Sequence, residues 1–161
     1  MFALALEGLD ESRARFDALP AALSEALAAK ANELAATLVA RVKYDKLSGG
    51  ALNVRSGALQ ASIVADVSTG PDGVVVSVGS DGDVKYAAIQ EYGGKTSAHE
   101  ILPDKARALA FMIGGTLRFA KSVHHPGSTI PARPYLGSAL DEMSGDIVAG
   151  LASVAESLGG A

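Results

Sequence analysis

Three histidines are the side chains of this sequence best suited to binding a metal ion. His124 and His125 are adjacent, and His99 lies upstream. Imidazole nitrogens are common zinc ligands. However, adjacent residues on an extended chain point to opposite sides, so both cannot easily bind one ion. We therefore expect no metal site and no other cofactor. The alternative that stays open is a metal-dependent hydrolase using His99, His124 and His125 with Glu91.

Glu91, which lies between Tyr86 and Tyr92, is a candidate general base. A general base must lie within hydrogen-bond reach of the proton that it removes, and the sequence places no nucleophile or second carboxylate beside Glu91. A structural hydrogen bond is the better interpretation. The sequence also contains no Gly-rich phosphate loop, serine elbow or HExxH motif, and it has no cysteine for thiol chemistry. We predict no catalytic residue and a protein that is not an enzyme.

A proline-rich segment at residues 124–135 combines stiffness with side chains that form contacts. Its sequence is His-His-Pro-Gly-Ser-Thr-Ile-Pro-Ala-Arg-Pro-Tyr, and three prolines with a glycine exclude an ordinary helix or a central strand. We predict an extended arm that ends at Pro134, which suits the first position of a helix. The alternative is a packed connector between sheet and helix. The candidate subunit or partner contacts are Arg133, Tyr135, Pro131, Pro134, His124, His125, Arg55 and Glu91.

Arg133 supports a narrower hypothesis. Its guanidinium can make a forked pair with a carboxylate, either within the chain or on a neighbouring subunit. Pro131 and Pro134 limit how far the backbone can move this side chain.

The composition excludes several classes of protein. With 161 residues, we expect a single domain spanning residues 1–161. A formal charge of −4 gives no electrostatic footprint for wrapping nucleic acid. No apolar run is long enough to span a bilayer, and no basic region precedes an apolar one at the N-terminus, so we expect neither a membrane partner nor a secretion signal.

Two apolar stripes with helical spacing predict two long helices. The first helix covers about residues 20–45, preceded by an N-terminal arm or helix at residues 1–19. Pro20 predicts either a kink or the start of a new helix. The second helix covers residues 134–158. The first stripe could pair with a partner chain as a coiled coil, but it is more typical of a helix that lies on a sheet.

Turn signals between these helices predict hairpins. Residues 70–73 (Gly-Pro-Asp-Gly) separate two strand-like segments, and Gly114-Gly115 separates residues 106–113 from residues 116–123. Residues 86–94 predict one or two helical turns that end at Gly93. The predicted fold is α+β, with a mainly antiparallel sheet of about four strands packed against two long amphipathic helices. Residues 46–57 form a basic connector that could contact an acidic partner.

Four segments, in this order, resemble tail-completion (neck) proteins of long-tailed bacteriophages and the related phage virion-morphogenesis proteins. Residues 56–63 (Ser-Gly-Ala-Leu-Gln-Ala-Ser-Ile) resemble a Thr/Ser-Gly-x-Leu-x-x-Ser-Ile segment. Residues 86–93 match a Tyr-Ala-x-x-x-Glu-x-Gly segment. Residues 99–111 and 126–136 match the later part of the family. The resemblance covers about residues 20–150.

This resemblance implies a small α+β virion protein at the phage head–tail junction, without catalysis. It implies a ring-forming tail-completion or tail-terminator component, and a head–tail adaptor is not separated from these by the motifs. The implied partners are copies of the chain itself, adjacent neck and tail proteins, and passing DNA that is bound without sequence specificity. The implied locations are the virion and, before assembly, the host cytoplasm. A prophage or a phage-derived particle would carry the same motifs.

Overall fold

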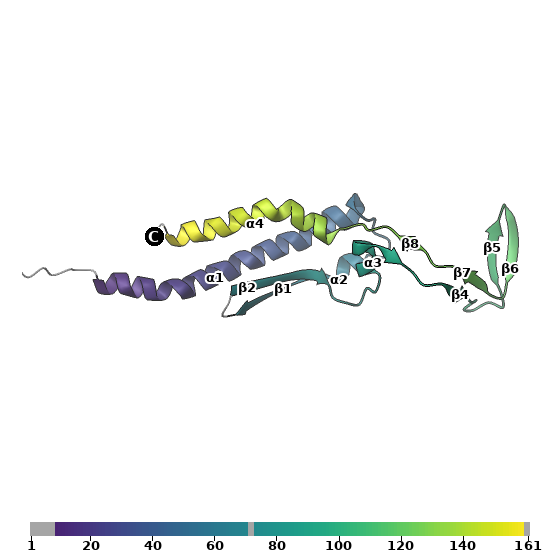
Figure 1. Ribbon diagram of the computed structural model, residues 1–161, viewed down its shortest axis with the longest axis horizontal. Helices are drawn as coiled ribbons and strands as arrows, with labels where there is room; N and C mark the ends of the chain where they lie inside the picture. Colours follow the sequence, from purple (N-terminus) through teal and green to yellow (C-terminus); the bar gives the residue numbers. More distant parts are fainter. Residues whose placement is uncertain (1–8, 71–72, 160–161) are drawn as a thin grey trace, which may run out of the picture. The chain divides into compact units, whose positions relative to one another are not determined.

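The computed structural model describes residues 9–70 and 73–159, with side-chain surroundings for residues 20–70 and 73–158. These residues divide into two compact units (Figure 1). The helical unit falls within residues 1–87 and 134–161, and the ribbon unit comprises residues 88–133. The elements along the chain are α1 (Leu9–Arg41), η1 (Val42–Gly50), α2 (Ala58–Ser62), β1 (Ile63–Gly70), β2 (Gly73–Ser80), α3 (Ala87–Tyr92), β3 (Gly94–Lys95), β4 (His99–Ile101), β5 (Leu109–Ile113), β6 (Thr116–Ala120), β7 (Val123–His125), β8 (Thr129–Ile130) and α4 (Leu136–Gly159).

Helix α1 runs through Pro20 without ending, so no new helix begins there. Proline removes one backbone donor, and the Ala-, Leu- and Glu-rich sequence on its C-terminal side offsets this loss because these residues are strong helix formers. The predicted N-terminal arm or helix is helical from Leu9 onward, and residues 1–8 lie outside the described residues.

The first helix continues beyond its predicted end at residue 45 as the wide helical turns of η1. The carbonyl oxygen of Lys46 accepts hydrogen bonds from the backbone N–H groups of Ala51, at 2.8 Å, and Leu52, at 3.0 Å. Gly49 has a φ of 120°, which a residue with a side chain rarely adopts, and the helical path ends there. Part of the predicted connector is therefore helical.

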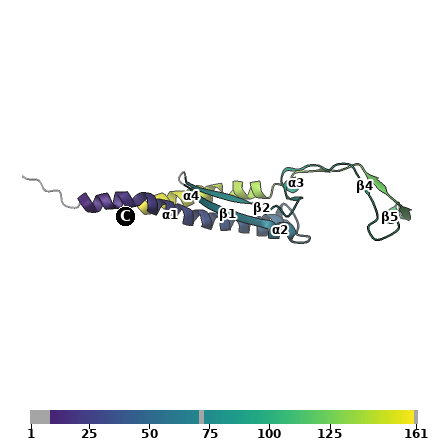
Figure 2. The same ribbon diagram turned by 90° about the horizontal axis from the view of Figure 1, so that it is seen from below.

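Helix α4 lies antiparallel to α1, and the two run side by side in both views (Figure 1, Figure 2). Arg41 contacts Asp146 at 3.5 Å, and Lys46 forms an ion pair with Glu142. Such partly exposed pairs each contribute about 0.2–1 kcal/mol. Lys46, a member of the predicted basic connector, is thus paired within the chain.

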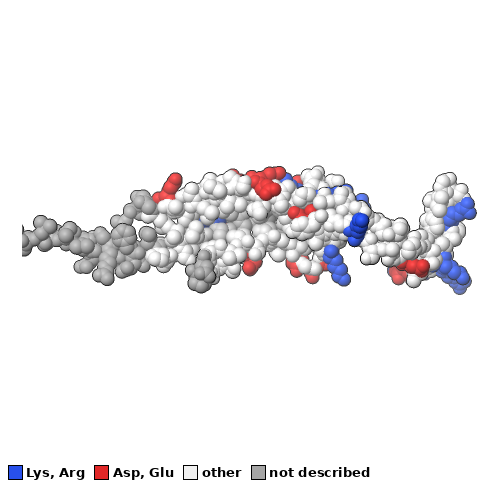
Figure 3. Space-filling view, viewed as in Figure 1, with Lys and Arg blue, Asp and Glu red and all other residues white. Residues whose placement is uncertain are grey.

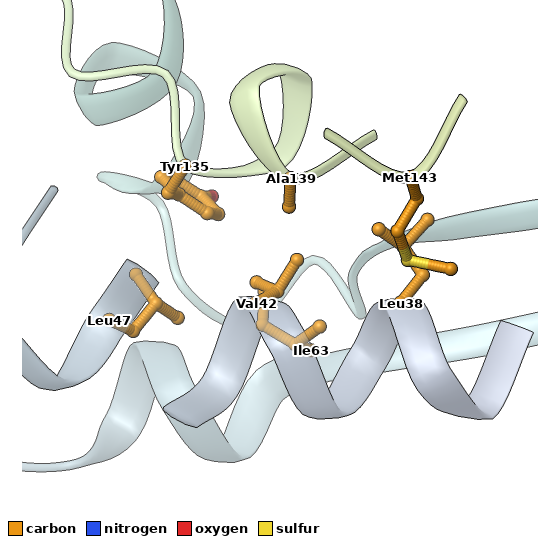
Figure 4. Close-up of a cluster of buried hydrophobic side chains, with 7 residues drawn as sticks. All are labelled: Leu38, Val42, Leu47, Ile63, Tyr135, Ala139 and Met143. Carbon is orange, nitrogen blue, oxygen red and sulfur yellow. The ribbon is translucent and has the colours of Figure 1, made fainter. Parts of the chain in front are cut away.

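The core of the helical unit lies where α1, η1, β1 and α4 meet (Figure 4). Each of its larger side chains contributes roughly 1.5–3 kcal/mol by leaving water. Its buried members are Leu38, Val42, Leu47, Ile63, Tyr135, Ala139 and Met143. The two long helices thus use part of their predicted stripes to cover each other, with Ile63 as the contribution from the strands.

Strands β1 and β2 form the hairpin predicted at residues 70–73, with register from Ile63↔Ser80 to Gly70↔Gly73. Residues 71–72 of the turn lie outside the described residues. The hairpin packs along α1, so α1 has α4 and the hairpin as neighbours. The predicted coarse fold, helices with antiparallel strands, is confirmed.

The prediction that about four strands form a single sheet is wrong. The described strands form four separate two-stranded antiparallel pairs: β1–β2, β3–β8, β4–β7 and β5–β6. Turn signals identify the two strands of a hairpin, which pair with each other. They do not show whether two hairpins also hydrogen-bond to each other to form one sheet. The last three pairs lie in the ribbon unit, whose two chain segments pair with each other and with no third strand in the described residues.

Candidate interaction surface

The three strand pairs of the ribbon unit are nested within one long hairpin. From Gly94↔Ile130 to His99↔His125, both segments advance by five residues, so the register is kept. It changes before Leu109↔Ala120, because seven residues (102–108) separate β4 from β5, whereas two (121–122) separate β6 from β7. The proline-rich segment is therefore extended, as predicted, and much of it is one side of this ribbon.

Two glycines allow the ribbon backbones to approach closely. A Cβ on Gly127 would lie 2.2 Å from the carbonyl oxygen of Thr96, and one on Gly93 would lie 2.7 Å from the backbone nitrogen of Ala132. Both glycines have positive φ, and Gly93 ends α3, as predicted. The close backbone approach and the positive φ give both positions a physical reason to be glycine.

The histidines divide between the two faces of β4–β7. His99 and His125 are paired and stack with ring centroids 5.1 Å apart, whereas His124 is paired with Glu100. The Nδ1 atoms of His99 and His125 have backbone partners. His99 Nδ1 donates a hydrogen bond to Ser97 O, and His125 Nδ1 accepts one from the backbone N–H of Gly127, each at 3.1 Å. Within residues 20–70 and 73–158, no group of three or more His, Cys, Asp or Glu side chains could hold a metal ion.

Two of the predicted contact residues are buried. Tyr135 is 1% exposed in the core, and its hydroxyl donates to the carbonyl oxygen of Ala87 at 3.4 Å. The prediction that Tyr135 contacts a partner therefore fails, because Pro134 leads directly into α4, whose beginning is packed on the core. Glu91 is 6% exposed, so its carboxylate is also not on the surface.

The other predicted contacts reach the surface. The backbone N–H of Arg133 donates to Gln90 O at 2.8 Å, whereas its exposed guanidinium has no carboxylate within 4.0 Å among the described side chains. The within-chain version of the Arg133 pair is therefore not formed here. His125 is half-buried. The exposed members of the predicted set are Arg55, His124, Pro131, Arg133 and Pro134.

The feature that sequence reasoning missed is the exposure of the apolar side chains on the predicted hairpin formed by β5, Gly114-Gly115 and β6 (residues 109–120), which we name the tip hairpin. Gly114 and Gly115 have φ of 57° and 80°, which confirms the predicted turn. The side chains of Met112, Ile113, Leu117 and Phe119 are between 53% and 68% exposed. The signal for it was the run of apolar residues at successive positions of β5, which leaves apolar side chains on both faces of that strand.

Charge is divided unequally between the two units. The ribbon unit has six Lys and Arg against three Asp and Glu, which leaves eight against 15 for the rest of the chain. Residues 105–133 contain five basic residues and no acidic one. Figure 3 shows Lys and Arg side chains at the tip hairpin, and mostly Asp and Glu on the visible face of the helical unit. The overall charge of −4 thus conceals a basic, apolar tip.

Comparisons with protein-family models, with curated proteins and with solved structures gave no match to this chain. In the described ranges, no helix is long and apolar enough to cross a lipid bilayer.

Proposed function

We propose that this chain is a structural subunit of a bacteriophage head–tail junction, of the tail-completion or tail-terminator class, and that it acts by binding. The observation that carries the proposal is the tip hairpin, which exposes four large apolar side chains among basic residues. Contiguous exposed apolar surface is typical of sites for protein–protein interaction. This feature supports a role in assembly, and the four ordered sequence motifs support the phage neck as the place.

In the proposed role, copies of the chain assemble as a ring and contact adjacent neck and tail proteins. The proposed ring does not need to bind the passing DNA sequence-specifically. The formal net charge of −4 is consistent with weak attraction between the chain and DNA phosphates. In this assembly, the exposed guanidinium of Arg133 would pair with a carboxylate of a neighbouring subunit. The protein would be found in the host cytoplasm before assembly and in the virion afterwards.

The test is deletion of the gene from an intact phage. We expect filled heads and separate tails that do not join, with a large loss of infectious particles. Supplying the wild-type chain from a plasmid should restore the yield, which controls for effects on neighbouring genes. Normal infectious yield from the deletion would contradict the proposal, as would turnover of a substrate by the purified protein at a useful rate.

A further inference from the structure

The tip hairpin has two faces, and both carry exposed apolar side chains. Directly opposed residues of an antiparallel pair share a face. Met112↔Leu117 and Ala110↔Phe119 therefore form a wholly apolar face, and Phe111↔Arg118 lies on the other face. A two-stranded hairpin alone is at best marginally stable in water, so a hairpin of this composition gains stability when a partner covers it.

A second exposed apolar surface lies on α4, away from the core. Leu140, Val148 and Leu151 are between 45% and 68% exposed, whereas Ala139 and Met143 are buried. Helical geometry places Leu140, Val148 and Leu151 within a quarter-turn of one another, since they follow spacings of eight and three residues. We name these three residues the α4 stripe. Leu140 and Leu151 belong to the predicted apolar face of this helix, which the core covers only in part.

The charges beside these two surfaces are complementary. Helix α4 contains four acidic residues and no basic one, and residues 105–133 contain five basic residues and no acidic one. Glu142 and Asp146 are paired with Lys46 and Arg41. Asp141 and Glu156 are exposed, and neither has an ion pair among the described side chains. Helical geometry places Asp141 on the same side of α4 as Val148, whereas Glu156 lies more than a third of a turn from Leu151.

The two surfaces also match in length. From its first to its last residue, a five-residue strand such as β5 extends about 13 Å, at about 3.3 Å per residue. The rise from Leu140 to Leu151 is about 16 Å, at 1.5 Å per residue. An apolar strand face can therefore cover most of the stripe, with the basic residues beside the hairpin near the unpaired carboxylate of Asp141.

We infer that the tip hairpin of one copy docks on the α4 stripe of a second copy of this chain. A second copy of the chain covers both apolar surfaces at once. An anionic lipid surface would instead cover the tip hairpin and leave the α4 stripe, with the acidic residues of α4, exposed to water. The inference names the contact between neighbouring copies in the proposed ring and in that respect rests on the proposed function. Its test uses purified protein, so its failure leaves the phage assignment to be decided by the gene deletion.

The absence of cysteine from the chain allows a direct test by disulfide capture. Phe119→Cys and Leu151→Cys are made in separate chains, mixed and oxidised. We expect a disulfide-linked heterodimer to be the main product. The matched control is Val75→Cys, which introduces an equally exposed cysteine on β2 and should not be captured by Leu151→Cys.

Charge reversal tests the same contact without a covalent bond. Lys121→Glu should weaken self-association, measured by sedimentation equilibrium, by about tenfold, and so should Asp141→Lys. A mixture of the two reversed chains should associate more strongly than either one alone, because each contributes the surface that the other can bind.

Three outcomes would overturn the inference. The first is a wild-type chain that stays monomeric at every concentration tested. The second is a Phe119→Cys, Leu151→Cys double variant that cross-links within a single chain at high dilution and gives no dimer on concentration. The third is binding of the tip to phosphatidylserine vesicles without self-association, which would assign the tip hairpin to a lipid surface.

Discussion

Gly127 faces Thr96 across the ribbon so closely that a Cβ on Gly127 would lie 2.2 Å from the carbonyl oxygen of Thr96. Gly127 also has a φ of 87°, in the left-handed region that side chains disfavour. The hydrogen bond from its N–H to His125 Nδ1 lies at the same crossing. The separation of the two ribbon segments near the β3–β8 pair thus depends on the absence of one side chain.

Gly127→Ala should open this end of the ribbon, because the obstructing atom is backbone and cannot rotate away. We expect faster amide hydrogen exchange at Thr96 and at the neighbouring strand residues. The control is Gly82→Ala, where φ is also positive, at 96°, but no atom lies within 4 Å of the added Cβ. That substitution should cost only about 1–3 kcal/mol of local strain and leave the ribbon protected. Equal exchange in the two variants would contradict this account.

Tyr135 should act through stability of the helical unit. Tyr135→Ala removes a large buried ring and should lower the free energy of unfolding by about 3–5 kcal/mol, measured by urea denaturation. Tyr135→Phe removes only the hydroxyl that donates to Ala87 O and should cost about 0.5–1.5 kcal/mol. A Tyr135→Ala chain that unfolds like the wild type would mean that the ring is not part of the core.

Arg133→Ala should leave stability nearly unchanged and impair assembly. Its guanidinium has no carboxylate within 4.0 Å in the described part of the chain, so removing it from an isolated copy should change stability by less than about 0.5 kcal/mol. Complementation of the deleted phage measures assembly, with Lys85→Ala as a control at another exposed basic position. Normal complementation by Arg133→Ala would show that the segment is only a connector.

The two glycines inside α4 should respond differently to alanine. Gly145 is exposed, and an added Cβ would meet no atom within 4 Å, so Gly145→Ala should stabilise the helical unit by about 1 kcal/mol. A Cβ on Gly150 would lie 3.3 Å from Lys30 Cδ and 3.6 Å from Leu34 Cδ1, so part of the same gain should be lost to crowding. Urea denaturation of both variants gives the comparison, and a larger gain at Gly150 would contradict the packing of α4 on α1.

The metal-dependent hydrolase that the sequence left open can be tested by elemental analysis and zinc titration of the purified protein. We expect no stoichiometric tight binding, because His124 lies on the ribbon face opposite to His99 and His125. Tight zinc or manganese at one ion per chain would favour the enzyme instead. Loss of that binding in a His99→Ala variant would then identify the ligands.

Local signals in the sequence predicted local structure well. Gly114-Gly115 identified its hairpin because that turn needs positive φ at both positions, and regular apolar spacing identified both long helices. The nesting of the ribbon was not predictable in the same way. Strands β3 and β8 have two residues each, too few to show alternation. Their pairing joins segments far apart in the sequence, since Lys95 and Thr129 are 34 residues apart, and it depends on the close approach that Gly127 allows.

The candidate surface was predicted only in part. Proline fixes the backbone wherever it occurs, so residues 124–135 were identified as extended, but proline does not say which neighbouring side chains face the core. Tyr135 was therefore assigned to a contact surface, whereas the structure buries it, and the exposure of Phe119 was not predicted. Burial depends on which elements cover a segment, and the separate two-stranded pairs leave β5 and β6 without a covering helix in the described residues.

The nesting of the ribbon also has a consequence for the order in which the chain can fold during synthesis. Its strands pair outward from Gly114-Gly115, so each closure joins segments already near each other, at low loop-closure cost. The helical unit lacks this advantage, since Arg41 and Asp146 are 105 residues apart. The ribbon can therefore form while the ribosome has yet to make α4, and until then the core face of α1 has no helix to cover it.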